Sequence, residues 1–318
     1  MSSPPVVKAA FFCGVMLVAT AVSAQSYPNK PIRVLANPPG GAPDFVARLV
    51  APALSASLGQ QVIVDNRRAA VAIEGAAKAP PDGYTIVITG SALWLLPFLR
   101  ANVPWDPVRD FSPITVATSA PTILVVHPAL AVNSVKDLIE LAKAKPGALN
   151  YGSTATGTLP HIAAELFKAM TDINVTRVAY KGAGQALIAI AGGEVQTAFA
   201  TTSSAMPHVR AGRLRALAVT SATPSALVPG LPTVAATVPG YEAVSIIAVF
   251  APARTPEAVV KRLNVELARI LSTAEAKERF FNTGVEAVGG SPAHLAATVK
   301  SEMARLGKVI RDAGIREE

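Results

Sequence analysis

The sequence predicts an α/β protein with two domains, each built from strands that alternate with helices. Short apolar runs such as 32–36 and 84–89 are followed by stretches with apolar residues at helical spacing. This alternation predicts a parallel sheet with helices on both faces. The chain has 318 residues, of which 51% are apolar, enough for two domains. No linker separates the two sets of elements, which favours domains connected by more than one crossing strand.

The N-terminal residues have the layout of a secretory signal peptide, predicted as residues 1–24. Lys8 precedes the apolar segment 9–22, and Val22-Ser23-Ala24 offers small residues for cleavage. An uncleaved N-terminal anchor helix is the alternative. The only cysteine, Cys13, lies in this segment, so the mature chain would have no disulfide and no thiol chemistry. We therefore expect a secreted protein.

Composition argues against nucleic acid as a ligand. The formal net charge is +8, yet the densest basic cluster is the pair Arg67-Arg68, and aromatic residues make up only 5% of the chain. A basic balance without stacking platforms favours encounters with small anions. No later segment has 18 continuous apolar residues, so no further membrane helix is predicted.

In the first half of the chain, a helix that contains Phe45 should end at Gly59, with a kink or break at Pro52. The other expected elements are strands at 61–64, 84–89 and 122–126, a helix in the second part of 67–79, a turn at 80–83 and a loop at 103–113.

In the second half, Ser134 opens a helix that runs to about Lys143, with a capping-box pattern. Ser291 should cap the last helix and Gly314 should stop it. The expected strands are 149–151, 175–179, 195–199, 215–219 and 245–251, and the expected helices are 160–170, 185–191, 207–211, 256–271, 275–282 and 292–313.

Two loops between a strand and a helix are candidates for binding an anion. The first contains Gly40, Gly41, Ala42, Pro43 and Asp44. Glycines let the backbone approach a bound group, and free N–H donors with the positive end of the dipole lie at the start of the helix. The alternative is that the glycines only form a tight turn and Asp44 only caps the helix.

The second loop is rich in hydroxyl groups and is the stronger local signal. Its hydroxyls and N–H groups form a neutral, donor-rich cradle that suits a carboxylate or a phosphate. No Gly-Lys-Ser/Thr follows, so nucleotide hydrolysis is not expected. A cap loop without a ligand is the alternative. The candidate residues are Ser153, Thr154, Thr156, Gly157 and Thr158.

His161 falls in the first turn of the next helix, where the dipole disfavours an imidazolium and favours a neutral side chain. His161 and Glu165 could share a face, but two such groups do not make a metal site, and we expect neither a metal nor a cofactor. Ser153 and His161 could act as nucleophile and base, although no acidic third member is evident. Tyr180 and Lys181 could face a cleft or be solvated.

Several motifs, taken together, resemble the Bug family of periplasmic solute-binding proteins, which serve tripartite tricarboxylate transporters. The match runs from Tyr27 to nearly the C-terminus. Its motifs are Tyr27-Pro28-Asn29-Lys30-Pro31-Ile32, Pro38-Pro39-Gly40-Gly41 with Asp44, Pro81-Asp82-Gly83-Tyr84, Leu149-Asn150-Tyr151, His161 to Phe167, Tyr180-Lys181-Gly182 and Gly212 to Thr220.

The resemblance implies a type II periplasmic binding-protein fold, two α/β domains with a ligand cleft between them. It places residues 25–124 and 249–318 in domain 1 and residues 125–248 in domain 2, with a hinge near Leu124 and Val249. It also implies that a ligand carboxylate meets both loops, with Ser91 and Tyr180 nearby, largely through backbone N–H groups and water.

Two departures from the family pattern bear on the ligand. Where the family usually continues Pro-Gly-Ala-Gly-Gly after Asn66-Arg67, this chain has residues 68–72, which begin with Arg68 and contain no glycine. Where the family commonly has an aspartate after Phe199, this chain has Ala200. An acid that could meet a ligand amine is absent, so we expect a carboxylate without an amine.

We therefore expect a monomeric binding protein, not an enzyme, that captures a small organic anion and delivers it to the permease subunits of a tripartite tricarboxylate-type transporter. A ligand-sensing partner of a two-component system is one alternative. A secreted serine-type hydrolase that uses Ser153 and His161 is the other.

Overall fold

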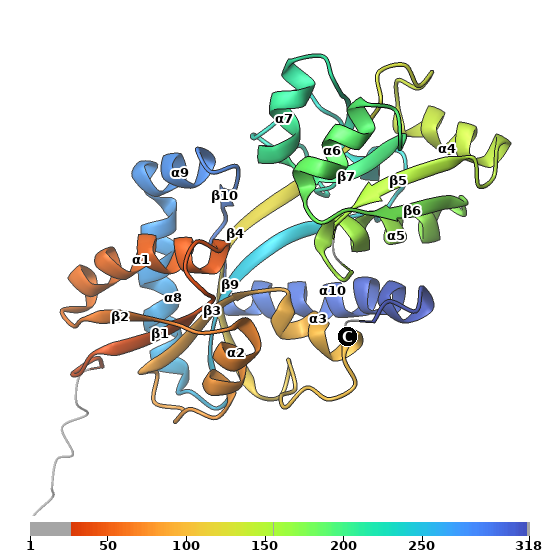
Figure 1. Ribbon diagram of the computed structural model, residues 1–318. Coiled ribbons are helices and arrows are strands. Elements are labelled where there is room, and N and C mark those ends of the chain that lie inside the picture. Colours follow the sequence, from red (N-terminus) through yellow and green to blue (C-terminus); the bar gives the residue numbers. More distant parts are fainter. Residues whose placement is uncertain (1–26, 155, 317–318) are drawn as a thin grey trace, which may run out of the picture.

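The structure is a computed structural model that describes residues 27–154 and 156–316. The predicted signal peptide, residues 1–24 with Cys13, lies outside the described residues. Figure 1 shows two lobes connected by two long strands, β4 (Phe111–Val126) and β9 (Val244–Pro252). The exact domain boundaries named above stay a prediction, and we refer to the two groups of elements as the first and second lobe.

The first lobe contains β1 (Ile32–Ala36), α1 (Ala42–Leu58), β2 (Val62–Asn66), α2 (Ala69–Ala77), β3 (Thr85–Gly90), α3 (Ala92–Leu99), α8 (Glu257–Ser272), α9 (Ala274–Phe281), β10 (Glu286–Ala287) and α10 (Pro292–Asp312). The second lobe contains α4 (Val135–Ala144), β5 (Leu149–Ser153), α5 (Leu159–Thr171), β6 (Val175–Ala179), α6 (Ala183–Ala191), β7 (Thr197–Thr201), α7 (Thr202–Arg210), β8 (Arg215–Val219) and the 3-10 helix η1 (Val234–Ala236).

The sheet is mixed, which corrects the expectation of a parallel sheet. The strand order is β2-β1-β3-β9-β4-β7-β5-β6, and β8 and β10 also pair with β4. Pairing is parallel between β1 and each of β2 and β3, and between β5 and each of β6 and β7. Every ladder of β4 and β9 is antiparallel. The prediction holds within each βα set and fails where the crossing strands join the sets.

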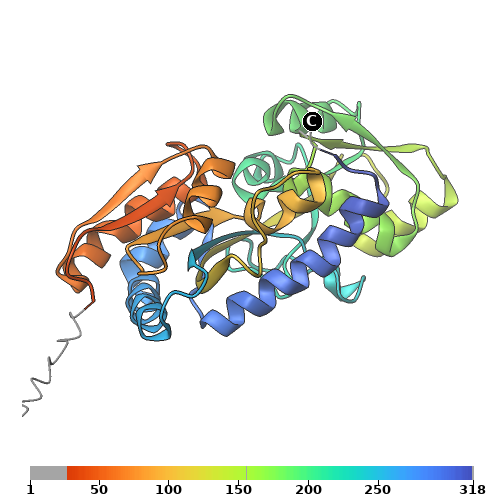
Figure 2. The same ribbon diagram turned by 90° about the horizontal axis from the view of Figure 1, so that it is seen from below.

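Helices cover both faces of the first lobe's sheet, as the alternation predicted. Ile32, Val34 and Ala36 of β1 pack into an apolar cluster with residues of α1 and α8. Leu35 of the same strand packs into a second cluster with residues of α2, α3 and α10. Successive strand residues point to opposite faces, so one strand supplies both clusters. Figure 2 shows α10 reaching from the first lobe to the second.

The strand β4 is longer than the sequence predicted. The loop expected at 103–113 ends early, because Phe111–Pro113 already pairs with β9, and the strand expected at 122–126 is only the last part of β4. Residues 111–121 pair with β9, whereas 122–126 pair with β7 and β8. Pro113 interrupts the apolar pattern, and a register shift beside it accommodates the irregularity. One strand therefore belongs to both lobes.

Three helices differ from the sequence-based expectation, and one of them is α7, which begins at Thr202 instead of at 207. The helix α3 was not predicted, because Leu93 to Leu96 are all buried and its sequence has no polar face to give an amphipathic pattern. The helix α1 continues through Pro52, where a kink or break was expected, and ends at Gly59 in the left-handed conformation, as predicted. The caps at Ser134 and Ser291 are confirmed, since each hydroxyl accepts a backbone N–H three residues later.

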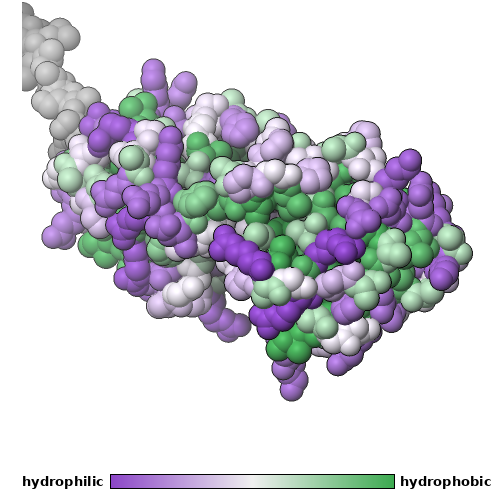
Figure 3. Space-filling view, turned by 90° about the horizontal axis from the view of Figure 1, so that it is seen from above, coloured by the Kyte–Doolittle hydropathy of each residue, from purple (hydrophilic) through white to green (hydrophobic). Residues whose placement is uncertain are grey.

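The described surface is mixed in character. Figure 3 shows hydrophilic residues scattered among apolar ones, without a single hydrophilic block on that face. Among residues 27–154 and 156–316, no helix is long and apolar enough to cross a membrane. In the same residues, no group of three or more His, Cys, Asp or Glu side chains could hold a metal ion.

Candidate functional site

A cleft of about 740 Å³ lies between the lobes. Its first-lobe wall comes from the start of α2 and from α3, and its second-lobe wall comes from the loop before α5. The lining contains two arginines and no acidic residue, so its electrostatic character favours an anion. The lining residues are Arg68, Ala69, Ala70, Val71, Ser91, Ala92, Leu95, Leu96, Leu99, Arg100, Thr156, Gly157, Thr158, Leu159 and Ser245.

The two walls come close together at Gly157. This glycine has a φ of +77°, and a Cβ added to it would lie 3.2 Å from Leu99 Cδ1. A side chain here would therefore be strained by the backbone and crowded by the opposite lobe. Figure 1 shows α5 and α3 on facing sides of the two lobes.

The hydroxyl-rich loop is organised by Arg177 in the neighbouring strand β6. Arg177 Nε donates to Ser153 Oγ at 2.7 Å, Nη2 donates to the Thr154 carbonyl at 2.7 Å, and Nη1 donates to Thr156 Oγ1 at 3.3 Å. A further bond joins the hydroxyls of Thr154 and Thr158 at 3.0 Å. These contacts hold Thr156, Gly157 and Thr158 against the cleft. Arg177 was not among the predicted site residues, although a lone cation inside an otherwise uncharged strand was a possible signal.

His161 supports this loop from beneath. It is 5% exposed, and its Nδ1 accepts the Gly157 N–H at 3.2 Å. Burial, helped by the nearby Arg177 charge, lowers the pKa of His161 to about 4. The ring is therefore neutral at physiological pH, as expected for the first turn of a helix. Ser153 Oγ accepts from Arg177 and donates to the Thr154 carbonyl, so the contacts of Ser153 do not assemble it with His161 as nucleophile and base.

On the first lobe, the two adjacent arginines differ in their surroundings. Arg67 pairs with Asp65 at 2.8 Å between Nε and Oδ1. Arg68 precedes the first turn of α2 and lines the cleft, and none of the described carboxylates forms an ion pair with it. The departure from the family pattern at this position thus puts an arginine among the residues that line the cleft.

The Gly40–Asp44 loop is not part of the cleft lining. Gly40 has a φ of +86°, which justifies glycine there. Asp44 is 3% exposed and accepts from Gly40 N at 3.0 Å, from Asn66 Nδ2 at 2.8 Å and from Arg48 Nε at 2.8 Å. Burial alone would raise the pKa of Asp44, but these hydrogen bonds together outweigh it and lower the pKa below its ordinary value. The Asp44 carboxylate therefore stabilises the conformation of the loop.

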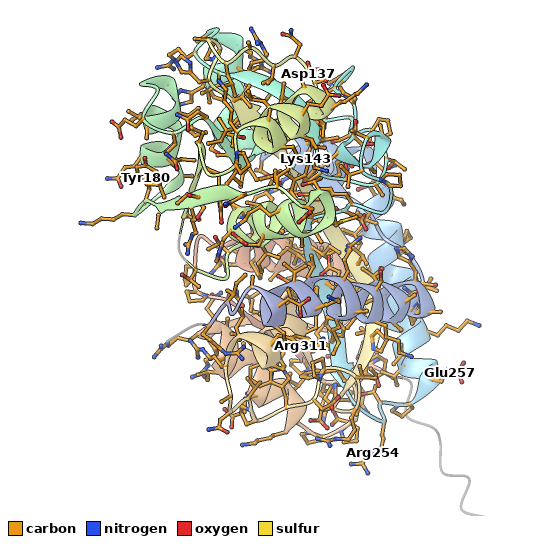
Figure 4. All side chains as sticks on the ribbon, turned by 90° about the vertical axis from the view of Figure 1, so that its right-hand side faces the viewer. Asp137, Lys143, Tyr180, Arg254, Glu257 and Arg311 are labelled. Atoms are coloured by element: carbon orange, nitrogen blue, oxygen red, sulfur yellow. The ribbon has the colours of Figure 1, made fainter. Side chains whose placement is uncertain are left out.

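The other predicted site residues fall into two groups. Ser91 lines the cleft with Thr156, Gly157 and Thr158. Tyr180 lies at the edge of the second lobe (Figure 4), and Ala200 is buried in an apolar cluster in β7. As ligand contacts, all of the predicted residues stay predictions. The apolar wall formed by α3 was not predicted, because the helix α3 itself was not predicted.

Comparisons with known proteins give a consistent result. The model of a family described as tripartite tricarboxylate transporter family receptor matches residues 46–315. The chain is 36% identical over 308 residues to a UPF0065 protein of Pseudomonas sp. (strain P51), covering 93% of this chain and 92% of the relative. It is 32% identical over 306 residues to the protein BugT of Bordetella pertussis, with 94% of each chain covered. A solved structure of Rpa4515 from R. palustris with adipate is 37% identical, with a TM-score of 0.69, and the match covers 91% of this chain and 99% of that one.

Proposed function

We propose a function for this chain, which belongs to the tripartite tricarboxylate transporter receptor family. The protein captures a small organic carboxylate outside the cytoplasm and delivers it to the membrane subunits of such a transporter. The family match confirms the resemblance to Bug proteins. Delivery, the membrane partner and export through residues 1–24 belong to the proposal.

The lining of the cleft carries the proposal. Hydroxyl groups from the second lobe face a wall of the first lobe that includes Arg68 and Ser91, and no acidic side chain is among the lining residues. A carboxylate in this space would meet a guanidinium on one side and hydroxyl and N–H donors on the other. A cavity of this size suits a small organic molecule with water around it.

The crossing strands support capture by closure. Because β4 and β9 connect the two lobes, a change of their twist would move one lobe relative to the other about a shared axis. The close approach of Gly157 to Leu99 would then act as the contact at which closure stops. Ligand binding would stabilise the closed arrangement, because the ligand touches both lobes only there.

Thermal unfolding of the purified protein against mono-, di- and tricarboxylates tests the proposal. A ligand that binds only the folded protein adds about 2.7 kcal/mol of stability at a hundredfold excess over its dissociation constant, so the unfolding midpoint should rise. Neutral sugars and amines of similar size serve as controls. If no carboxylate raises the midpoint, or if amines raise it more, the proposed ligand class is wrong. Loss of uptake of the stabilising carboxylate on deletion of this gene would test delivery.

A further inference from the structure

One wall of the cleft is apolar over most of its length. The helix α3 faces the cleft with Ala92, Leu95, Leu96 and Leu99, and its eight residues correspond to a length of about 12 Å. The three leucines are between 4% and 8% exposed, so they are fixed in the core of the first lobe and present only their edges to the cleft. Polar side chains flank this stretch, with Ser91 before the helix and Arg100 after it.

The groups opposite the apolar wall are hydroxyls whose hydrogen-bonding capacity is partly used within the loop. Thr156 Oγ1 accepts from Arg177 and keeps its own hydrogen as a donor, and one of the Thr154 and Thr158 hydroxyls donates to the other at 3.0 Å. The side chain of Leu159 adds a further apolar group to the lining. A ligand that lies along α3 would therefore meet apolar surface on the side of its body that faces the helix, and its charged groups would meet the arginines of the lining, Arg68 and Arg100.

We propose that the cleft selects carboxylates with an apolar body and discriminates against those that carry a hydroxyl in mid-chain, with Arg68 as the residue that holds the carboxylate. This inference rests on the proposed function and names the ligand class of the same site. A mid-chain hydroxyl placed against Leu95, Leu96 and Leu99 would lose its water without gaining a partner, which is unfavourable. A methyl group at the same place would bury apolar surface, which is favourable.

Three ligands of matched size test the selection by calorimetric titration of the purified protein: adipate, 3-methyladipate and 3-hydroxyadipate. We expect 3-methyladipate to bind as tightly as adipate or tighter, and 3-hydroxyadipate to bind at least tenfold more weakly. Equal or tighter binding of 3-hydroxyadipate would overturn the inference. Tighter binding of malate or citrate than of adipate would also overturn it. So would a protein that binds other carboxylates but binds neither adipate nor 3-methyladipate.

These outcomes differ from a failure of the proposed function. In that case no carboxylate of any class would bind or raise the unfolding midpoint. If carboxylates bind but the hydroxyl has no effect, only the apolar-body inference is wrong.

The adjacent arginines provide a matched pair of variants for the role of Arg68. Arg68→Gln should weaken adipate binding at least tenfold and reduce its dependence on salt concentration, because one charge pair is lost. Arg67→Gln removes the same charge one residue away, from a side chain that pairs with Asp65, and should change the affinity less than threefold. Arg67 and Arg68 are neighbours in the sequence and both are exposed, so neither variant should unfold. Equal effects of the two variants would show that Arg68 acts only through its general charge.

Discussion

The two loops that precede α1 and α5 are each held in shape by one charged side chain, and the two charges have opposite signs. In the first, the buried carboxylate of Asp44 gathers donors from Gly40, Asn66 and Arg48. In the second, the guanidinium of Arg177 donates to Ser153, Thr154 and Thr156. The organising charge of the first loop is buried and lies in the first turn of the helix that follows, α1. That of the second loop lies on a neighbouring strand, and the tip of this loop faces the cleft.

Residue composition alone does not decide which loop lines a site. Both loops contain glycine and polar residues before a helix, and both were predicted to suit an anion, the second more strongly than the first. What differs is which polar groups remain available after the loop has satisfied its own hydrogen bonds. Changes to the two organising charges should therefore have different consequences.

The largest effect is expected on stability, from Asp44→Ala. Removal of this carboxylate leaves Asn66, Arg48 and the Gly40 N–H without their acceptor beside a buried position, so the free energy of unfolding should fall by about 3 kcal/mol. Urea denaturation would measure it. The control is Asp65→Ala, which removes an ion pair whose arginine is 55% exposed and should cost less than about 1 kcal/mol. Similar losses in both variants would contradict the structural role of Asp44.

The organising cation of the second loop should affect binding more than stability. Arg177→Gln removes the donors that hold Ser153, Thr154 and Thr156, so we expect at least tenfold weaker binding of the best carboxylate and a loss of about 1 kcal/mol of stability. Titration calorimetry and urea denaturation give the two values. Thr176→Ala, at the exposed neighbouring position of β6, is the control and should leave the affinity unchanged. A stability loss without any change in affinity would separate Arg177 from the site.

A pair of glycine variants compares the loops directly. Gly40 and Gly157 both have a positive φ, so alanine at either should cost about 1 kcal/mol of backbone strain. A Cβ on Gly40 would meet nothing within 4 Å, whereas one on Gly157 would meet Leu99 across the cleft. Gly157→Ala should therefore also weaken ligand binding several-fold, and Gly40→Ala should not. Reversed effects would indicate that the first loop holds the ligand.

The smallest effect is expected from pH. Because the pKa of His161 is lowered to about 4, its ring should stay neutral and the affinity for a carboxylate should be constant between pH 5.5 and 8. A histidine in the unfolded chain binds a proton below about pH 6.5, whereas His161 in the folded protein binds one only near pH 4. The free energy of unfolding should therefore decrease as the pH falls from about 6.5 towards 4. The ring's NMR titration would check this. A midpoint above 6 would contradict the assigned burial.

Much of the local structure could be predicted from the sequence. Ser134, Ser291 and Gly59 mark helix ends because a cap depends on residues only a few positions away. The strands 175–179 and 215–219 were placed at their observed bounds. The ordered set of motifs also predicted the family and its two-lobed fold. Each of these features is encoded by neighbouring residues or by their order along the chain.

Only the tertiary structure decided which of these residues face the cleft. It gave β4 its full length, because β9 pairs with the part that has an irregular pattern. It made α3 a wall of the cleft, and it fixed that helix by bonds such as Trp94 Nε1 to Glu302 Oε2, between residues 208 positions apart. It also separated Arg68, which lines the cleft, from Arg67, which pairs with Asp65. Solvent access and pairing depend on groups distant in sequence, and no local pattern records their distances.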